Sequence, residues 1–584
     1  MSSTRPGSFP RAALGAILAL AMMGAFGALA SADGGGPVTL QDVFEADGIL
    51  DHVLHATLED LDVRGPAPEI QGGVTFVQKT INGIRYFGYP EGTDPTDPAN
   101  FTEKRSRVTV ELWFPNQVDF GDLDTSWLLL NQGGDPNDTE SESLRLKRIF
   151  SRKMARQGIP AAIWFESDLH PVVPGNPVGT IAEQFGYNAD GRLLHEGLTW
   201  MMLKDPDVTP LEIRDLRFHF RFGMAQAYML ATTFCQRFLE EHYGPSSSTW
   251  AAALKSIIAG GSKRGTACVS VCGLDPRVRG ARISGSQSLN SDALGTYARY
   301  RKDWGECPGG RLEERADFVF WSEEHGDDAP SYYDIYLPDR CPESYQNILF
   351  ADIVGTHDFA NPLGAHATFW PRFDGLDENG LPDPTEMAID HVRLYRENKN
   401  HGSESFIGEV NGFQISKSLV LLWRLVRHLA LGKDLPRIEL IDLDASGSAT
   451  WTARVRITGA HDPGDEQLTF WVALSDDRDF RRCTPPVETL PFNPCYEGDG
   501  DDNREEEDKF IAITPTQVTQ DGLFRDLVIP VPTEYAAFSN TPILCTHVEL
   551  VLEGNNPNRF GDDLWMATGL VYRNDELYPE LTCP

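Results

Sequence analysis

The chain has 584 residues and a formal net charge of −35, and 41% of its residues are hydrophobic and 23% charged. This length exceeds what one hydrophobic core normally serves, so we expect two or more folded domains. The composition is that of a globular protein and excludes a collagen, a coiled coil or a globally disordered chain. The acidity argues against nucleic acid as a partner, because binding to its phosphate backbone relies on Lys and Arg.

The first 32 residues predict an export signal. Arg5 and Arg11 precede the apolar run 12–30, and Ala-x-Ala cleavage points follow at Ala30 and Ala32. An uncleaved anchor is the alternative, because the run is nearly long enough to span a bilayer. We favour cleavage, and therefore expect a secreted or periplasmic protein without a membrane span once the signal is removed.

Residues 33–104 predict an N-terminal extension with a short helical segment and a β-hairpin. The hairpin is expected at Asn82-Gly83, which lies between two β-rich runs. Three apolar strands are expected next, in "RSRVTVELWFPNQV", "SWLLLNQGG" and "GIPAAIWFE". Residues 211–244 then have helical spacing and end in glycine.

The strand "SIIAGG" runs directly into a predicted helix, and further strands are expected in "ILFADIV" and "HVRLYR" before a helix at 416–432. Strands that alternate with helices predict a mainly parallel, doubly wound sheet of the α/β-hydrolase kind over residues 105–436. The irregular, aromatic segment of about 286–345 is expected to form a cap over its pocket. Alternating β-type runs after Arg437 predict an all-β, immunoglobulin-like sandwich over 437–584.

The nine cysteines are an odd number, and sequence neighbours suggest three disulfides, Cys307–Cys341, Cys483–Cys495 and Cys545–Cys583. Three further cysteines do not have zinc-site spacing and are interpreted as buried apolar residues, namely Cys235, Cys268 and Cys272. The acidic loop 497–510 does not fit an EF-hand, so a solvated loop is favoured over a calcium site. No cofactor or metal is expected.

Ser262 is the candidate nucleophile. Gly260 and Gly261 precede it and Gly265 follows, as a sharp strand-to-helix turn requires. A hydroxyl needs a general base, an acid that orients this base, and donors for the oxyanion. By itself the motif is equally typical of a glycine-rich turn with Ser262 as the N-cap of a helix.

The order of the residues that follow favours a catalytic triad. In doubly wound hydrolases the order is Ser, Asp or Glu, then His, each beyond a strand. Asp358 follows the strand "ILFADIV" and His401 follows "HVRLYRENKN", whereas Asp352 lies inside a strand. Two other histidines compete less well, because His366 follows Asp358 too closely and His391 begins a strand instead of ending it.

The oxyanion donors are expected at the start of the helix after Ser262 and beyond an earlier strand. These are the backbone N–H of Lys263 and that of Gly133 or Gly134, although the two glycines also fit a simple strand-ending turn. The side chain of Arg264 either holds an anionic group of the substrate or pairs with an internal carboxylate, and we favour the second reading.

Several segments resemble the PhoPQ-activated pathogenicity-related proteins, among which are the autocrine proliferation repressor proteins. The similarity spans about residues 105–560 and lies in "IIAGGSKRGTACVSVCGLDPRV", "CPESYQNILFADIVGTHDFANP", "RLYRENKNHG", "GKDLP" and "FWVALSDDRDFR". Thr266 stands where that family usually has Trp. The resemblance implies an exported α/β-hydrolase-like protein with a β-sandwich tail and the triad Ser262, Asp358 and His401.

These observations predict an exported serine hydrolase that cleaves an ester or peptide bond through an acyl-enzyme. Its substrate is expected to be a small molecule or a peptide. The alternative is a secreted signalling or binding protein on the same fold, in which catalysis is not essential. Cleavage of a carbohydrate ester ranks below both. The substrate within these classes and the oligomeric state are left open by the sequence.

Overall fold

The protein is described from a computed structural model of the whole chain. It describes residues 40–88, 102–133, 141–165, 220–261, 263–285, 342–356, 369–373, 375, 387–399, 405–410, 413–475, 509–538, 541–552 and 564–573. The proposed signal peptide, most of the cap and most of the acidic loop lie outside these ranges. None of the described helices is both long and apolar enough to cross a membrane.

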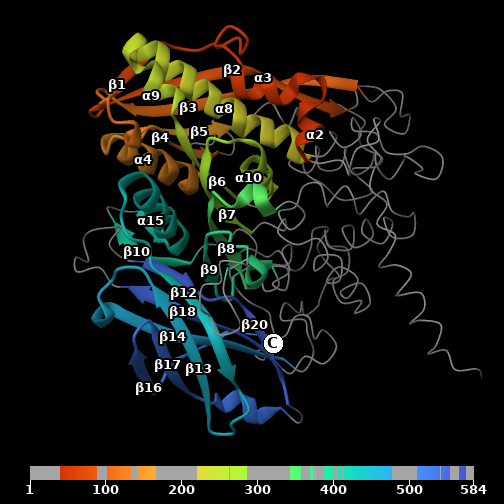
Figure 1. Cartoon of the computed structure of the whole chain (residues 1–584), viewed down its shortest axis with the longest axis vertical. Coiled ribbons are helices and arrows are strands. Elements are labelled where there is room, and N and C mark those ends of the chain that lie inside the picture. Colours follow the sequence, from red (N-terminus) through yellow and green to blue (C-terminus); the bar gives the residue numbers. More distant parts are fainter. Residues whose placement is uncertain are drawn as a thin grey trace, which may run out of the picture.

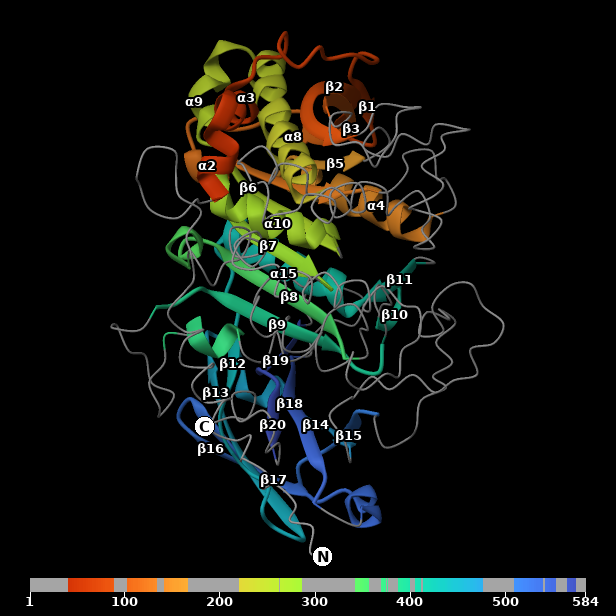
Figure 2. The same cartoon turned by 90° about the vertical axis from the view of Figure 1, so that its right-hand side faces the viewer.

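A large mixed sheet forms the centre of the molecule (Figure 1). In spatial order its first nine strands are β1 (Glu69–Gln71), β2 (Val74–Gly88), β3 (Thr102–Pro115), β5 (Ala161–Phe165), β4 (Trp127–Gln132), β6 (Lys255–Gly261), β7 (Val278–Ser284), β8 (Leu349–Gly355) and β9 (His391–Arg396). Strands β5, β4, β6, β7, β8 and β9 are parallel neighbours, whereas β3 is antiparallel to β2 and to β5. The carboxyl ends of the six parallel strands therefore lie at the same edge of the sheet. Figure 2 shows four of these strands, β6 to β9, side by side.

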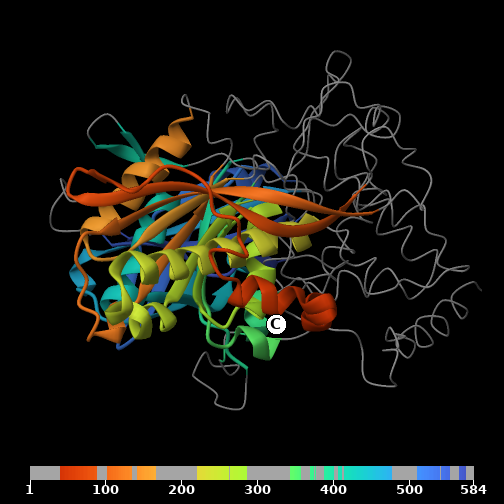
Figure 3. The ribbon, with the colours of Figure 1, turned by 90° about the horizontal axis from the view of Figure 1, so that it is seen from above.

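Helices cover both faces of this sheet (Figure 3). They are α2 (Leu40–Glu45), α3 (Ile49–His55), α8 (Phe220–Tyr243), α9 (Ser248–Ala252) and α10 (Lys263–Leu274) on one face, and α4 (Glu142–Arg156) and α15 (Lys417–Leu431) on the other. Strand β4 shows why both faces are filled: Leu128 and Leu130 belong to the cluster with α8 and α10, and Trp127 and Leu129 to the cluster with α4 and α15. The predicted α/β architecture is confirmed.

The predicted helix at 416–432 is confirmed with its ends. The Ser416 hydroxyl accepts a hydrogen bond from the Leu419 N–H at 3.2 Å and so caps α15. Gly432 ends the helix in the left-handed conformation, with φ of 59°. These two signals are local, which is why the sequence predicts them well.

The predicted hairpin at Asn82-Gly83 is wrong. Strand β2 continues through both residues and pairs with β3 on either side of them, from Val74 opposite Pro115 to Gly88 opposite Thr102. The register shifts between Asn82 and Ile84, and Gly83 has φ of 129°, so the glycine forms a β-bulge. An Asn-Gly pair is typical of positions where the backbone adopts positive φ. Such positions occur in β-bulges as well as in hairpin turns, so the pair alone does not distinguish the two.

The region after Arg437 consists of antiparallel strands that lie below the α/β part in Figure 1. One sheet has the order β12 (Arg437–Asp444), β13 (Thr450–Thr458), β17 (Phe524–Pro530) and β16 (Gln517–Asp521). The other strands are β14 (Glu466–Ser475), β15 (Ile511–Ile513), β18 (Ile543–Leu552), β19 (Leu564–Ala567) and β20 (Val571–Arg573). Side chains of both sets, such as Trp451 and Phe470, share one buried cluster.

The second set of strands also extends the central sheet. Strand β19 pairs with β9 through Ala567 and Arg393, so β18, β14 and β15 continue the sheet beyond β9. This pairing covers the outer edge of β9, which would otherwise present unpaired backbone groups. The immunoglobulin-like topology of the region stays a prediction. A small two-stranded sheet, β10 (Phe406–Val410) and β11 (Phe413–Ser416), leads into α15.

Candidate active site

The position of Ser262 is defined by the elements on either side of it. Strand β6 ends at Gly261 and α10 begins at Lys263, so a single residue separates strand from helix. Ser262 itself lies outside the described residues. The first turn of a helix has N–H groups without intrahelical acceptors, so the start of α10 at Lys263 is suited to stabilise an oxyanion. The strand-to-helix turn predicted from the glycines is therefore confirmed, whereas the role of Ser262 stays a prediction.

Gly260 allows the backbone of β6 to pass close to α10. A Cβ on Gly260 would lie 2.7 Å from the carbonyl oxygen of Arg264, and it would also collide with the hydroxyl of Tyr228. This hydroxyl is fixed, because it donates a hydrogen bond to the Ala259 carbonyl at 3.0 Å. The carbonyl of Arg264 is backbone, so it cannot give way without moving the start of α10.

We expect Gly260→Ala to destabilise the protein by about 1–3 kcal/mol, because overpacking against backbone forces a shift of the helix. Gly261→Ala is the matched control: its Cβ would meet the carbonyl oxygen and the Cβ of Ser284 at ordinary distances of 3.4 and 3.8 Å. Urea unfolding of both variants measures the difference. Equal unfolding midpoints would show that the turn is not tightly packed at Gly260.

The turns after β8 and β9 are joined by hydrogen bonds. The Thr356 N–H donates to the Arg396 carbonyl at 3.1 Å, and the Asn398 N–H donates to the Thr356 hydroxyl at 2.8 Å. Asn398 has φ of 59°, a left-handed conformation that asparagine tolerates. Asp358 and His401 lie outside the described residues, two positions after Thr356 and three after Asn398. The chain therefore leaves the sheet toward both residues from adjacent, connected turns.

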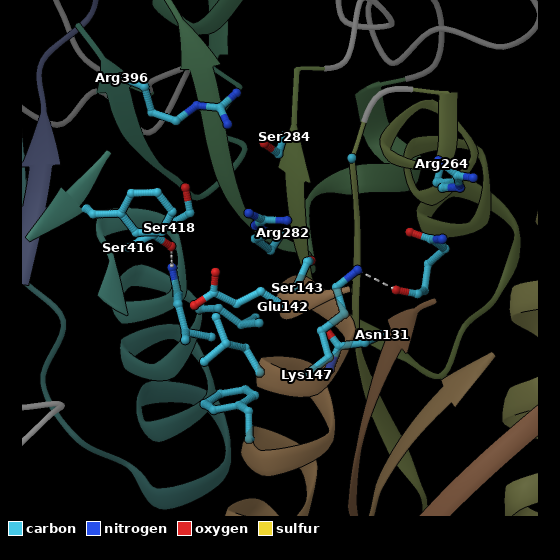
Figure 4. A pocket seen from close by; sticks show the side chains of 17 residues that line it. Asn131, Glu142, Ser143, Lys147, Arg264, Arg282, Ser284, Arg396, Ser416 and Ser418 are labelled. Atoms are coloured by element: carbon cyan, nitrogen blue, oxygen red, sulfur yellow. Dashed lines mark hydrogen bonds between the residues drawn. The ribbon is translucent and has the colours of Figure 1, made fainter. Parts of the chain in front are cut away.

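A cavity of about 440 Å³ opens at this carboxyl edge of the sheet (Figure 4). Gly261 and Arg264, on either side of Ser262 in sequence, belong to its wall, as does Arg396 at the end of β9. Arg282 and Ser284 on β7 and the beginnings of α4 and α15 also line it. In open parallel sheets, ligands bind in the crevice outside the carboxyl ends of the strands, so this cavity is the candidate active site.

Helix α4, which forms one side of the cavity, is not among the elements that we predict from the sequence. Its signals are a Ser141 side chain that accepts a hydrogen bond from the Leu144 N–H at 3.3 Å and the glycine at 158 beyond its end. Asn131 and Gln132, at the end of β4, line the same cavity. The cavity thus contains polar residues that no motif indicates.

Of the two glycines proposed as oxyanion donors, Gly133 is among the described residues and Gly134 is not. The Gly133 N–H donates to the Trp164 carbonyl at 2.6 Å and so continues the pairing of β4 with β5. Its missing side chain makes room for Phe165 and Ile163, which a Cβ would contact at 2.5 and 2.9 Å. An N–H that is used in the sheet does not point at an oxyanion. Of the two alternatives we therefore keep Gly134, which lies outside the described residues.

Asp352 and His391 are used elsewhere in the fold. Asp352 lies within β8, and its carboxylate accepts a hydrogen bond from the Trp370 indole at 2.8 Å. His391 begins β9, at the edge of the sheet opposite to the cavity. Its Nδ1–H donates to the Ile389 carbonyl at 2.8 Å, and its Nε2 accepts from Arg393, so the imidazole is neutral. This agrees with leaving both residues out of the triad.

Burial, with the nearby charges of Arg393 and Arg437, holds the pKa of His391 well below its ordinary value of 6.5. The unfolded chain therefore binds a proton that the folded chain does not, and stability is lost as the pH falls below about 6.5. We expect His391 to contribute a loss on the order of 1 kcal/mol between pH 7.5 and 5.5. The opposite charge of Glu439, 3.8 Å from Nε2, reduces this loss.

The measurement is the urea midpoint of the wild type and of His391→Gln at both pH values. Subtracting the variant's change in stability from that of the wild type removes the contributions of the other titrating groups. His547 is one of them, because burial also lowers its pKa. A wild type and a variant with the same pH dependence would contradict the assignment.

A buried charge network lies immediately beyond β9. It is formed by Glu397, Lys417, His547 and Glu549, whose side chains are at most 12% exposed. The Lys417 ammonium lies 3.3 Å from Glu397 and also pairs with Glu549, and the His547 Nε2–H donates to Glu397 at 3.2 Å. The network ties the chain that leads to His401 to the start of α15 and to β18.

The charges in this network hold one another in place. Burial opposes the ionisation of Glu397, but the hydrogen bond from His547 and the charge of Lys417 outweigh it and lower the pKa of this carboxyl. Burial also opposes the charge of Lys417, but the two glutamates outweigh it and raise the pKa of the ammonium. Burial and the negative Glu397 raise the pKa of Glu549. Each charge thus depends on the others.

Three of the cysteines are buried thiols, as interpreted from the sequence: Cys235 on α8, and Cys268 and Cys272 on α10. Burial raises the pKa of the Cys268 thiol to about 12 and that of the other two as well. In the described part of the chain there is no cluster of three or more ligands suited to a metal ion. Cys545 is likewise a buried thiol, so the suggested pair Cys545–Cys583 is not formed, whereas the other two suggested pairs consist of cysteines outside the described residues and stay predictions.

No protein-family model matches the chain, and no curated protein matches it. Among solved structures, it is similar to acetyl xylan esterase 1 from a Thermoanaerobacterium species, with 12% identity over 63% of this chain and 90% of that chain and a TM-score of 0.31. It is also similar to a glucuronoyl esterase from Solibacter usitatus, with 13% identity over 62% and 92% and a TM-score of 0.28. Likenesses at this level leave the activity of this chain open, and its own strand order and contacts define the candidate site.

Proposed function

We propose that this chain is an exported serine hydrolase that cleaves an ester or a peptide bond. Ser262 attacks the carbonyl carbon while His401 takes its proton, and His401 then returns this proton to the leaving group. Asp358 orients His401, and the N–H groups of Lys263 and Gly134 stabilise the oxyanion. Water hydrolyses the acyl-enzyme by the same steps. The reaction needs no cofactor.

One observation carries the proposal: the ends of β6, β8 and β9 meet at one edge of the sheet, beside a cavity of about 440 Å³. These are the strands that lead to Ser262, Asp358 and His401 in the order of doubly wound hydrolases. The hydrogen bonds between Thr356, Arg396 and Asn398 bring two of the three strand ends together.

The proposal includes a relationship to the PhoPQ-activated pathogenicity-related proteins and an immunoglobulin-like C-terminal sandwich. It is supported by the segments quoted above, which follow in the same order along the chain, and by the antiparallel strands after Arg437. Export is supported by the charged and apolar pattern of the first 32 residues.

The test is a hydrolysis profile of the purified chain against p-nitrophenyl acyl esters and aminoacyl p-nitroanilides. Turnover of the esters alone, or of the anilides as well, supports the proposal and separates an esterase from a peptidase. If no substrate is cleaved and a fluorophosphonate does not label the folded chain, the proposal is wrong. The alternative of a secreted binding or signalling protein would then replace it.

A further inference from the structure

A second pocket, of about 340 Å³, lies at the amino end of β9, at the opposite edge of the sheet from the candidate active site. Residues 388–391, which lead into β9, form one of its sides. The first residues of β12 and the last residues of β13 form another side, and Figure 2 shows these two strands below β9. The second pocket therefore lies between the α/β part and the C-terminal strands.

Strands β12 and β13 turn polar side chains toward this pocket. In their antiparallel register Arg437 lies opposite Thr458 and Glu439 lies opposite Arg456, and all four residues line the pocket. Side chains alternate between the two faces of a sheet, and the intervening Ile457 is buried in the hydrophobic cluster on the other face. The alternation of polar and apolar residues along the strands thus produces the polar wall.

Most of the charges at the second pocket are paired with one another. The Arg437 guanidinium donates to both carboxylate oxygens of Asp390, at 2.9 to 3.1 Å. The Glu439 carboxylate accepts from Arg393 at 3.2 Å. These ion pairs connect the start of β12 with β9 and with the residue before it, and so hold the two sides of the pocket in place.

Arg456 is the exception. Among the residues that the structure describes, its side chain has no hydrogen-bond or ion-pair partner. Its Nε is buried without an acceptor, so the side chain is packed in place, whereas the residue as a whole is only partly buried and lines the pocket. A guanidinium remains charged at every physiological pH, and a buried donor without an acceptor costs free energy. Arg456 is thus a fixed cation at the pocket wall whose anion is missing.

The rest of the wall offers hydrogen bonds to a neutral polar group. Gln346 and Thr458 contribute an amide and a hydroxyl group, and the carboxylate of Asp390 is 55% exposed, so it can accept further hydrogen bonds. The apolar residues in the described lining are Ala388 and Ile389, and the second of these is only 2% exposed. The lining therefore suits a ligand that carries hydroxyl groups in addition to an anion.

We infer that the second pocket binds a small organic acid that carries hydroxyl groups. The carboxylate pairs with the terminal nitrogens of Arg456, because a guanidinium matches a carboxylate with two parallel hydrogen bonds. The hydroxyl groups form hydrogen bonds with Gln346, Asp390 and Thr458. The inference does not depend on the proposed hydrolase function, since the pocket lies at the other edge of the sheet and shares no residue with the candidate active site.

The experiment compares three six-carbon probes by ligand-observed NMR titration of the purified chain at constant ionic strength. D-gluconate carries a carboxylate and hydroxyl groups, D-glucitol carries hydroxyl groups alone, and hexanoate carries a carboxylate alone. We expect D-gluconate to bind with a Kd of about 1 mM and the other two to bind about tenfold more weakly. Absent binding of D-gluconate, or equal affinity for D-gluconate and either of the other probes, would overturn the inference.

Two charge-removing variants on the same strand locate the site. Arg456→Met is expected to lower the affinity for D-gluconate about tenfold, to that of D-glucitol. Arg454→Met is the matched control and should keep the wild-type affinity, because Arg454 does not line the pocket and is paired with Asp521 and Asp526. Equal decreases in both variants would show that the general charge of the strand attracts the anion, and the inference would be wrong.

Thr458→Val provides a test that does not depend on the folding of the arginine variants. It retains the shape of the side chain and every charge, but it removes one hydroxyl group from the pocket wall. We expect the affinity for D-gluconate to decrease severalfold and that for hexanoate to remain unchanged. An unchanged affinity for D-gluconate would contradict the proposed contact with the hydroxyl groups of the ligand.

Discussion

Replacing Ser262 by alanine is expected to abolish labelling by a fluorophosphonate and to lower ester hydrolysis by about 10⁴-fold or more. The hydroxyl is the atom that forms the acyl-enzyme, so no neighbouring group can replace it. The unfolding midpoint should remain close to that of the wild type, because the glycines around Ser262, and not its side chain, permit the close passage from β6 into α10. Gel-based labelling and p-nitrophenyl ester turnover measure the two effects.

The matched control is Ser256→Ala. Ser256 lies on the same strand β6, is fully buried, and lies near the opposite end of the strand from the cavity. We expect this variant to be labelled and to hydrolyse esters like the wild type. Labelling that persists in Ser262→Ala would mean that another residue is the nucleophile, and the assignment of the triad would be wrong.

Replacing Lys417 by methionine is expected to destabilise the protein by about 3–5 kcal/mol. The substitution leaves Glu397 and Glu549 as buried carboxylates without the cation between them. Removing one member of a buried ion network costs much more than the network contributes, because the remaining charges stay desolvated and uncompensated. Urea unfolding at neutral pH measures the loss.

Two further variants test this explanation. Lys255→Met removes an ammonium whose partner Asp124 is 98% exposed, at 3.8 Å, so only a small loss of stability is expected. The double variant Lys417→Met with Glu549→Gln should recover part of the loss, because one of the two uncompensated charges is gone. A double variant as unstable as the sum of the two single variants would contradict the network.

Much of the α/β part could be predicted from short stretches of sequence. The strands at "SWLLLNQGG", "SIIAGG", "ILFADIV" and "HVRLYR" and the capped helix α15 occur where expected. Each of these predictions depended on a signal within a few neighbouring residues. An apolar run indicates a buried strand, and a capping residue indicates the end of a helix. The site residues Ser262, Asp358 and His401 were selected by their position after such strands, and their chemistry stays a prediction.

The structure corrected what local signals leave ambiguous. Asn82-Gly83 forms a bulge and not a hairpin, because both flanking runs pair with the same long strand β3. His391 and Asp352, two reasonable catalytic candidates by residue type, are bound to Arg393 and Trp370 away from the cavity.

By itself, the sequence determined the alternation of strands and helices, the tight turn between β6 and α10, and the order of the three candidate catalytic residues. Only the tertiary structure decided which strand ends meet, which cations surround the cavity, and that β19 closes the edge of β9. It also decided that Glu397 and His547, 150 positions apart, share a hydrogen bond. The physical reason is that hydrophobic periodicity specifies which side of an element is buried, whereas the partner across that buried side is selected by packing between segments distant in the chain.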